Sequence, residues 1–162
     1  MDMLVKLYNV ADDPALFEQL RQEGITFRRV IAPDLNRVLD FVQEHFSENW
    51  VSECTVAIMR GHCWIAVKEK QVIGFACYDT TMPDFFGPTG VRPDMRGRQI
   101  GKALLLRALL SMKEMGYAYA IIGWTGPQAF YAKCVGATPI PNSIPYSYHN
   151  MICVDTDEQK GS

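Results

Sequence analysis

The chain has 162 residues, a formal net charge of −2, 48% hydrophobic residues and 21% charged residues, which is typical of one globular domain with a hydrophobic core. The slightly acidic balance argues against general binding of nucleic acid. No apolar run is long enough to span a membrane and no signal peptide opens the chain, so we expect a cytoplasmic protein with one domain over residues 1–162.

Short strands and helices alternate in the N-terminal part of the chain. Asp13 and Pro14 are typical of a helix start and Gly24 of a helix end. Pro33 opens a second helix, whose apolar residues recur at helical spacing. The elements predicted here are strands at 3–8 and 25–31 and helices from Pro14, from Asp34 to Phe46, and at 49–59.

The middle of the chain predicts a hairpin, then a strand and a long helix. Residues 63–67 and 72–78 read as two strands joined by a polar turn. Residues 85–91 predict another strand, and residues 100–115 predict a helix. The apolar face of that helix should lie on the sheet, with the flanking leucines covered as well. It comprises Leu104, Leu105, Ala108, Leu109, Met112 and Met115.

The last third predicts two more strands and a short helix. Residues 117–123 are almost continuously apolar, as expected of a strand buried on both faces. A helix follows at 128–134, closed by Gly136, then a strand at 147–154 and a disordered tail at 155–162. Strands that are first antiparallel and then linked by helices predict an α/β fold with a mixed sheet and helices on both faces.

Five cysteines form an odd number without a CxxC pair, and four of them lie in apolar or strand-like surroundings. This pattern favours buried reduced thiols over a disulfide framework or a zinc site. The sequence therefore predicts no metal. The cysteines are Cys54, Cys63, Cys77, Cys134 and Cys153.

A loop rich in glycine and arginine joins the strand at 85–91 to the long helix. A helix N-terminus has unpaired N–H groups and partial positive charge, and Gly97 allows close approach of the backbone. Arg96, Arg98 and Lys102 add cations at the same point. The loop therefore predicts a phosphate site, although an exposed basic turn before a core helix would have the same composition.

The segment from Arg96 to Gly101 resembles the Arg/Gln-x-x-Gly-x-Gly/Ala acyl-CoA signature of the GNAT (GCN5-related) N-acetyltransferases, with Gln99 in place of the first glycine. The resemblance implies the GNAT fold, a central and mostly antiparallel sheet, from about residue 25 to 154. The strand and helix within residues 1–24 are a variable addition. Acetyl-CoA is the implied cosubstrate. The residues implied to bind it are Val91, Arg96, Gly97, Arg98, Gln99, Ile100, Gly101 and Lys102.

A second segment, Phe130 to Ala137, resembles the family's Phe/Leu-Tyr-Glu-Lys-x-Gly-Phe motif, with Ala132 replacing the acid and one residue inserted before the glycine. The resemblance implies that Tyr131 protonates the departing CoA thiolate, and a phenol stays protonated at neutral pH. Tyr131 could instead only pack against the cofactor or the core. The family's usual asparagine is absent near Trp124. Cys134 could suggest a covalent route, but a helix cysteine is more often a core residue.

The family's reaction needs no nucleophilic side chain. The protein must align an amine with a thioester, remove a proton and stabilise the oxyanion, and the strand carrying Gly90 and Val91 would supply a backbone donor. The sequence identifies no general base; a water chain is an alternative to the nearest titratable groups, which are Glu53, Asp79, Asp84 and His149. For the acceptor we expect Glu53, Phe86 and His149. Other candidate pocket aromatics are Phe46, Trp50, Phe85, Tyr146 and Tyr148.

The resemblance implies an N-acetyltransferase that moves an acetyl group from acetyl-CoA to a primary amine of a small molecule or peptide, by direct attack in a ternary complex. One alternative is a non-catalytic module that binds acyl-CoA as a regulatory ligand. Another is a nucleic-acid-binding protein that uses the basic loop, which the net charge disfavours. We expect neither nucleic acid nor membrane as partners. Homodimers are common in the family, but no sequence stripe identifies an interface.

Overall fold

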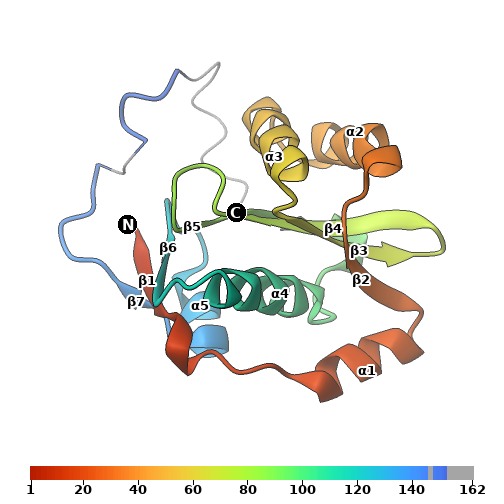
Figure 1. Ribbon diagram of the computed structural model, residues 1–162, viewed down its shortest axis with the longest axis horizontal. Coiled ribbons are helices and arrows are strands. Elements are labelled where there is room, and N and C mark those ends of the chain that lie inside the picture. The colour runs from red at the N-terminus through yellow and green to blue at the C-terminus, as the bar shows by residue number, and fades with distance from the viewer. Residues whose placement is uncertain (146–147, 153–162) are drawn as a thin grey trace.

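The computed structural model describes residues 1–145 and 148–152. At its centre is a seven-stranded sheet with the strand order β2-β3-β4-β5-β6-β1-β7. The paired strands are antiparallel except β5 and β6, which run parallel. Helices α2 and α3 cover one face of the sheet, and α1, α4 and α5 lie on the other (Figure 1). The predicted mixed α/β sheet with helices on both faces is confirmed.

The strands are β1 (Met3–Lys6), β2 (Ile25–Arg29), β3 (Cys63–Lys68), β4 (Gln71–Tyr78), β5 (Phe85–Val91), β6 (Tyr119–Ile122) and β7 (Thr138–Pro139). The helices are α1 (Pro14–Gln22), α2 (Leu35–His45), α3 (Glu48–Arg60), α4 (Ile100–Glu114) and α5 (Gln128–Val135). Short 3₁₀ turns lie at Leu7–Asn9, Ala32–Asp34 and Pro93–Met95. In the part of the chain described, no helix is long and apolar enough to cross a membrane.

Local signals explain where several helices begin and end. Asp13 precedes α1, and its Oδ1 accepts a hydrogen bond from the Leu16 N–H at 3.2 Å. Ser47 caps α3 in the same way, accepting from the N–H of Trp50. Gly136 ends α5 with a φ of 67°, in the left-handed region that glycine adopts without strain. These capped ends match the helices predicted from the sequence.

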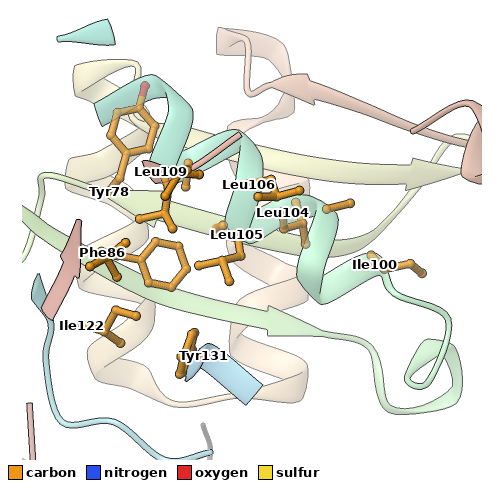
Figure 2. Close-up of a cluster of buried hydrophobic side chains, with 14 of the residues drawn as sticks. Tyr78, Phe86, Ile100, Leu104, Leu105, Leu106, Leu109, Ile122 and Tyr131 are labelled. Atoms are coloured by element: carbon orange, nitrogen blue, oxygen red, sulfur yellow. The ribbon is translucent and has the colours of Figure 1, made fainter. Parts of the chain in front are cut away.

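The larger core cluster lies between the sheet and α4. Leu104, Leu105 and Leu109 of α4 are fully buried, and Figure 2 shows Leu105 and Leu109 beside Phe86 of β5. Leu106 is buried too, which confirms that the flank of α4 is covered. The prediction for Met115 was wrong: its side chain is 48% exposed, because α4 ends at Glu114 and Met115 lies beyond the last residue that faces the sheet.

A second cluster packs α2 and α3 on the opposite face and contains three buried cysteines. The Sγ atoms of Cys54 and Cys77 lie 3.6 Å apart, and Cys63 pairs with Cys77 across β3 and β4. All three are free thiols, as predicted. Cys134 is also a free thiol and is half-buried, whereas Cys153 lies outside the described residues.

The N-terminal strand, whose place the sequence left open, completes the sheet. β1 lies between β6 and β7: Met3 is opposite both Ile122 and Pro139. The predicted strand at 147–154 is absent from its described part, because residues 148–150 form a turn and 151–152 have no regular structure. β1 already occupies the edge of β6 that a C-terminal strand would need. The rest of that segment and the tail at 155–162 lie outside the described residues.

The start of β6 also differs from the prediction. The strand begins at Tyr119 rather than at residue 117, and Tyr119 is 44% exposed. It pairs with Lys6, the last residue of β1, and its ring packs against Tyr8 at the surface, with 5.7 Å between the ring centroids. The prediction that this strand is buried on both faces is therefore wrong for its first residue, Tyr119.

Candidate functional site

Strands β5 and β6 separate after a short parallel contact. They pair only through Phe85 with Ile121 and Phe86 with Ile122, and β6 then ends while β5 continues to Val91. The Arg92 N–H donates to the Ile73 carbonyl of β4 at 2.8 Å. Because donors alternate along an antiparallel strand, the N–H and C=O of Val91 point away from β4, toward the edge that β6 leaves open.

The loop after β5 brings backbone N–H groups to the start of α4. Residues 96–99 are exposed, while Met95 and Ile100 are buried and anchor the two ends of the loop. Gly97 has a φ of 81° and Gln99 a φ of 67°, so Gln99 takes a left-handed conformation that glycine would adopt freely. No side chain caps α4 and its first turn contains no acidic residue. Its first N–H groups are therefore available to an anion.

Basic side chains surround this helix start, with different partners. Arg96 Nε donates to the carbonyl of Val91 at 3.2 Å. Arg98 is exposed and makes no side-chain hydrogen bond or ion pair within the described residues. Lys102 Nζ lies 3.6 Å from Asp13 Oδ2, which links the first turn of α4 to the cap of α1. Both arginines of the loop are thus exposed, with Arg96 bonded to the backbone of β5, and Lys102 is paired with a carboxylate.

Tyr131 of α5 lies on the α4 side of the point where β5 and β6 separate. Its side chain is 5% exposed and lies near Phe86 (Figure 2). The ring of Tyr131 packs edge-to-face against Phe86 and Phe130, at centroid distances of 6.2 and 5.1 Å. Burial, with a smaller contribution from Cys134, raises the pKa of Tyr131 to about 12. Burial also raises the pKa of the Cys134 thiol, although Lys102 and Lys133 oppose this shift. Tyr131 therefore keeps its proton, and Cys134 is not activated as a thiolate.

The opposite side of the separation point, beneath α3, carries aromatic rings and a carboxylate. Tyr148 stacks on Trp124 at 5.6 Å and meets Phe85 edge-on at 6.2 Å. Thr81 Oγ1 donates a hydrogen bond to Glu53 Oε1 of α3. We call these five residues the acceptor-side cluster. Its place is fixed by Gly123, the first residue after β6: a Cβ there would lie 2.2 Å from the Tyr148 hydroxyl oxygen.

The residues expected at the acceptor site are divided between the two faces. Glu53 is half-buried and belongs to the acceptor-side cluster. Phe86 is buried on the α4 face, against Tyr131, and its neighbour Phe85 faces the cluster instead. His149 is exposed, next to Tyr148 in sequence. Tyr146 lies outside the described residues.

Asp79 and Asp84 lie together before the start of β5. Asp79 Oδ1 accepts from the Asp84 N–H at 2.7 Å and from the Tyr117 hydroxyl at 2.8 Å. Asp84 Oδ1 is buried without a hydrogen-bond partner, and burial together with the charge of Asp79 raises the pKa of Asp84 to about 6. Across the described part of the chain, no group of three or more His, Cys, Asp or Glu side chains could hold a metal ion.

Sequence reasoning did not find Thr81 or Asp2. Asp2 Oδ1 accepts a hydrogen bond from the Trp124 N–H at 2.8 Å, so the first residues of the chain support the wall of the acceptor-side cluster. Thr81 comes from the loop between β4 and β5. Neither residue belongs to a motif, and only the folded chain brings them to this point.

The sequence from 59 to 134 matches a protein family described as acetyltransferase (GNAT) domain. The GCN5-related glucosamine N-acetyltransferase region of a fungal multi-domain GH3 β-N-acetylglucosaminidase aligns with a TM-score of 0.68 and 18% identity, covering 83% of this chain and 19% of that one. A GCN5-related N-acetyltransferase from Sphaerobacter thermophilus aligns with a TM-score of 0.64 and 22% identity, over 85% and 47% of the two chains. No curated protein matches the sequence significantly.

A third solved structure is YhbS from Escherichia coli, a GNAT family N-acetyltransferase in complex with CoA. It aligns with a TM-score of 0.50 and 20% identity, over 58% of this chain and 59% of that one. The chain spans less than half the length of the first two structures that it matches. It has the GNAT fold, and the part that matches the acetyltransferase (GNAT) domain, residues 59–134, includes the loop before α4 and Tyr131.

Proposed function

We propose that the protein transfers the acetyl group of acetyl-CoA to a primary amine of a small molecule or peptide, by direct attack in a ternary complex. The observation that carries the proposal is the uncapped start of α4 beside the open edge of β5. It combines free backbone donors, a left-handed loop and two arginines at one place. The solved structure of YhbS with CoA, which shares the fold, supports the same ligand.

Each part of the donor side has a distinct task. The N–H groups of the first turn of α4 bind the pyrophosphate, and Arg96 and Arg98 add charge-assisted hydrogen bonds. The N–H of Val91 donates to an acceptor oxygen of the pantetheine arm or the thioester, because it points to the open edge of β5. The residues present fit a long anionic thioester with phosphate at one end and a neutral arm at the other.

Bound acetyl-CoA supplies an activated acetyl group: a C–N bond to the amine forms and the C–S bond breaks. Tyr131 gives its phenolic proton to the departing sulfur and regains a proton from solvent. Its pKa of about 12 keeps it protonated before the transfer. The acceptor approaches from the side of the acceptor-side cluster, opposite to Tyr131, and loses its surplus protons to water.

Calorimetric titration with acetyl-CoA tests the binding site. Gly101→Glu should abolish binding, because a carboxylate at the start of α4 repels phosphate. The change should leave the fold intact, since the nearest atoms to a Cβ at Gly101 lie at 3.8 Å. The control is Gly101→Ala, which adds the Cβ without the charge and should bind.

A thiol-release assay with a panel of amines tests transfer. Tyr131→Phe should lower kcat by about 100-fold or more, the usual range for general acid catalysis, while acetyl-CoA affinity is kept. Tyr119→Phe, at a surface tyrosine, is the control. Binding of acetyl-CoA with no amine acetylated would overturn the enzyme and favour the non-catalytic acyl-CoA-binding module. Absence of binding would overturn both.

A further inference from the structure

The acceptor-side cluster has a chemical character that acetyl transfer alone does not require. Three aromatic rings, those of Phe85, Trp124 and Tyr148, meet at the end of the β5–β6 pairing. α3 contacts β5 and lies beside the β4–β5 loop (Figure 1). Glu53 of α3 accepts a hydrogen bond from Thr81 of that loop. A simple alkyl monoamine would need only an apolar wall here, whereas a carboxylate beside aromatic faces is a site for a cation.

The charges around the acceptor-side cluster also favour a cation. Burial raises the pKa of the Tyr148 phenol, and the negative charges of Glu53 and Asp2 raise it further. Asp2 is 5% exposed, and its carboxylate accepts a hydrogen bond from the backbone N–H of Trp124. Two carboxylates of different elements thus make the potential around the Tyr148 ring negative, which attracts a positive group and disfavours an anionic one.

The reacting nitrogen of an acceptor must be neutral when it attacks, so it cannot itself remain the cation that this site binds. A second nitrogen on the same molecule can. We infer that the acceptor is an aliphatic diamine or polyamine whose second ammonium group is held by the carboxylate of Glu53 and the ring faces of Trp124 and Tyr148, while its first amine reaches the point where β5 and β6 separate. The inference rests on the proposed function and narrows its acceptor class.

Matched pairs of acceptors test the inference. Butane-1,4-diamine should have a kcat/KM about 10- to 100-fold higher than butan-1-amine, the range of one charge-assisted hydrogen bond with a cation–π contact. Glu53→Gln should reduce this ratio to within a few-fold of unity, mainly by raising the KM for the diamine. Glu48→Gln makes the same change at an exposed position on the same helix and should keep the ratio.

The ring contribution is tested at Tyr148. Tyr148→Phe retains the ring and should keep the preference for the diamine, whereas Tyr148→Leu should lower it by about 3- to 10-fold. Equal kcat/KM values for the diamine and the monoamine, or a ratio unchanged by Glu53→Gln, would overturn the inference and leave the proposed acetyl transfer standing.

A binding measurement that needs no turnover distinguishes a failure of the proposed acetyl transfer from a failure of the diamine site. The CoA-saturated protein is titrated calorimetrically with butane-1,4-diamine. Saturable binding that Glu53→Gln weakens by at least about tenfold, in a protein that acetylates no amine, would overturn the proposed function and support the diamine site. Absence of diamine binding in a protein that does acetylate monoamines would overturn the diamine site alone.

Discussion

Adding a single methyl group to β5 should destabilise the protein measurably. Gly90 lies beneath the ring of Phe46, and a Cβ at Gly90 would lie 2.4 Å from Phe46 Cζ and 2.6 Å from Cε1. The ring cannot retreat freely, because it stacks on Trp50 at 5.2 Å and meets Phe75 edge-on at 5.5 Å. Gly90→Ala therefore forces a displacement of several packed rings.

The magnitude follows from two opposing effects. Overpacking a close-packed core costs about 1–3 kcal/mol, whereas alanine recovers about 0.4–1 kcal/mol through the smaller entropy of the unfolded chain. We expect the free energy of unfolding to fall by about 1–2 kcal/mol. Urea denaturation followed by circular dichroism measures this change, with an unchanged m-value as the sign that the unfolded state is not altered.

A double-mutant cycle identifies the cause. Phe46→Leu removes the end of the ring, so Gly90→Ala should cost little in that background, and the coupling energy should be about 1–2 kcal/mol. Gly101→Ala is the contrasting change, since its Cβ makes only ordinary contacts, and it should not destabilise the protein. Full stability of Gly90→Ala, or additivity of the two changes within about 0.5 kcal/mol, would refute the packing of Phe46 on Gly90.

Two further changes act on charge and backbone. The raised pKa of Asp84, about 6 against 3.8, means that the folded state binds more protons than the unfolded state between these values, so stability falls as the pH rises through this window. Asp84→Asn should therefore stabilise the protein by about 1 kcal/mol near pH 7.5, after allowance for partial solvent screening, and by much less near pH 4. Urea curves at both pH values measure it. A gain of the same size at both would contradict the shift, and the exposed Asp40→Asn is the control. Gln99→Gly removes a left-handed non-glycine residue and should stabilise the protein by about 0.5–1 kcal/mol in thermal unfolding. A tenfold loss of acetyl-CoA affinity in this variant would show that the Gln99 side chain takes part in binding.

Elements with local signals could be predicted from the sequence, and the position of β1 in the sheet could not. Asp13 and Pro14 mark the start of α1 by capping chemistry that needs no tertiary context. The pairing of Met3–Lys6 with β6 depends instead on which strand reaches that edge first. The sequence of a strand of four residues does not show which strand it pairs with. The strand predicted at 147–154 is not formed in its described part.

The same distinction separates the two halves of the candidate site. The loop before α4 is one contiguous motif, and its conformation follows from Gly97 and the uncapped helix start. The acceptor-side cluster is assembled from several separate segments. Along a strand, neighbouring side chains face opposite sides of the sheet. The sequence does not show which of two adjacent phenylalanines faces the cluster: in the structure Phe85 does, and Phe86 packs in the core beside α4.

The position of β1 has a consequence for the order in which the nascent chain can fold. Ribosomes add about 5–20 residues per second, so Met3–Lys6 emerges on the order of ten seconds before β6, its partner at Tyr119–Ile122. During that interval β2, β3, β4 and β5 can already pair, because they follow one another in the chain. The pairing of β1 with β6 cannot form until β6 has been synthesised, and neither can the hydrogen bond between Trp124 and Asp2. The part of the acceptor-side cluster that Trp124 contributes is therefore supported only after β6 has been made, by a residue synthesised 122 positions earlier.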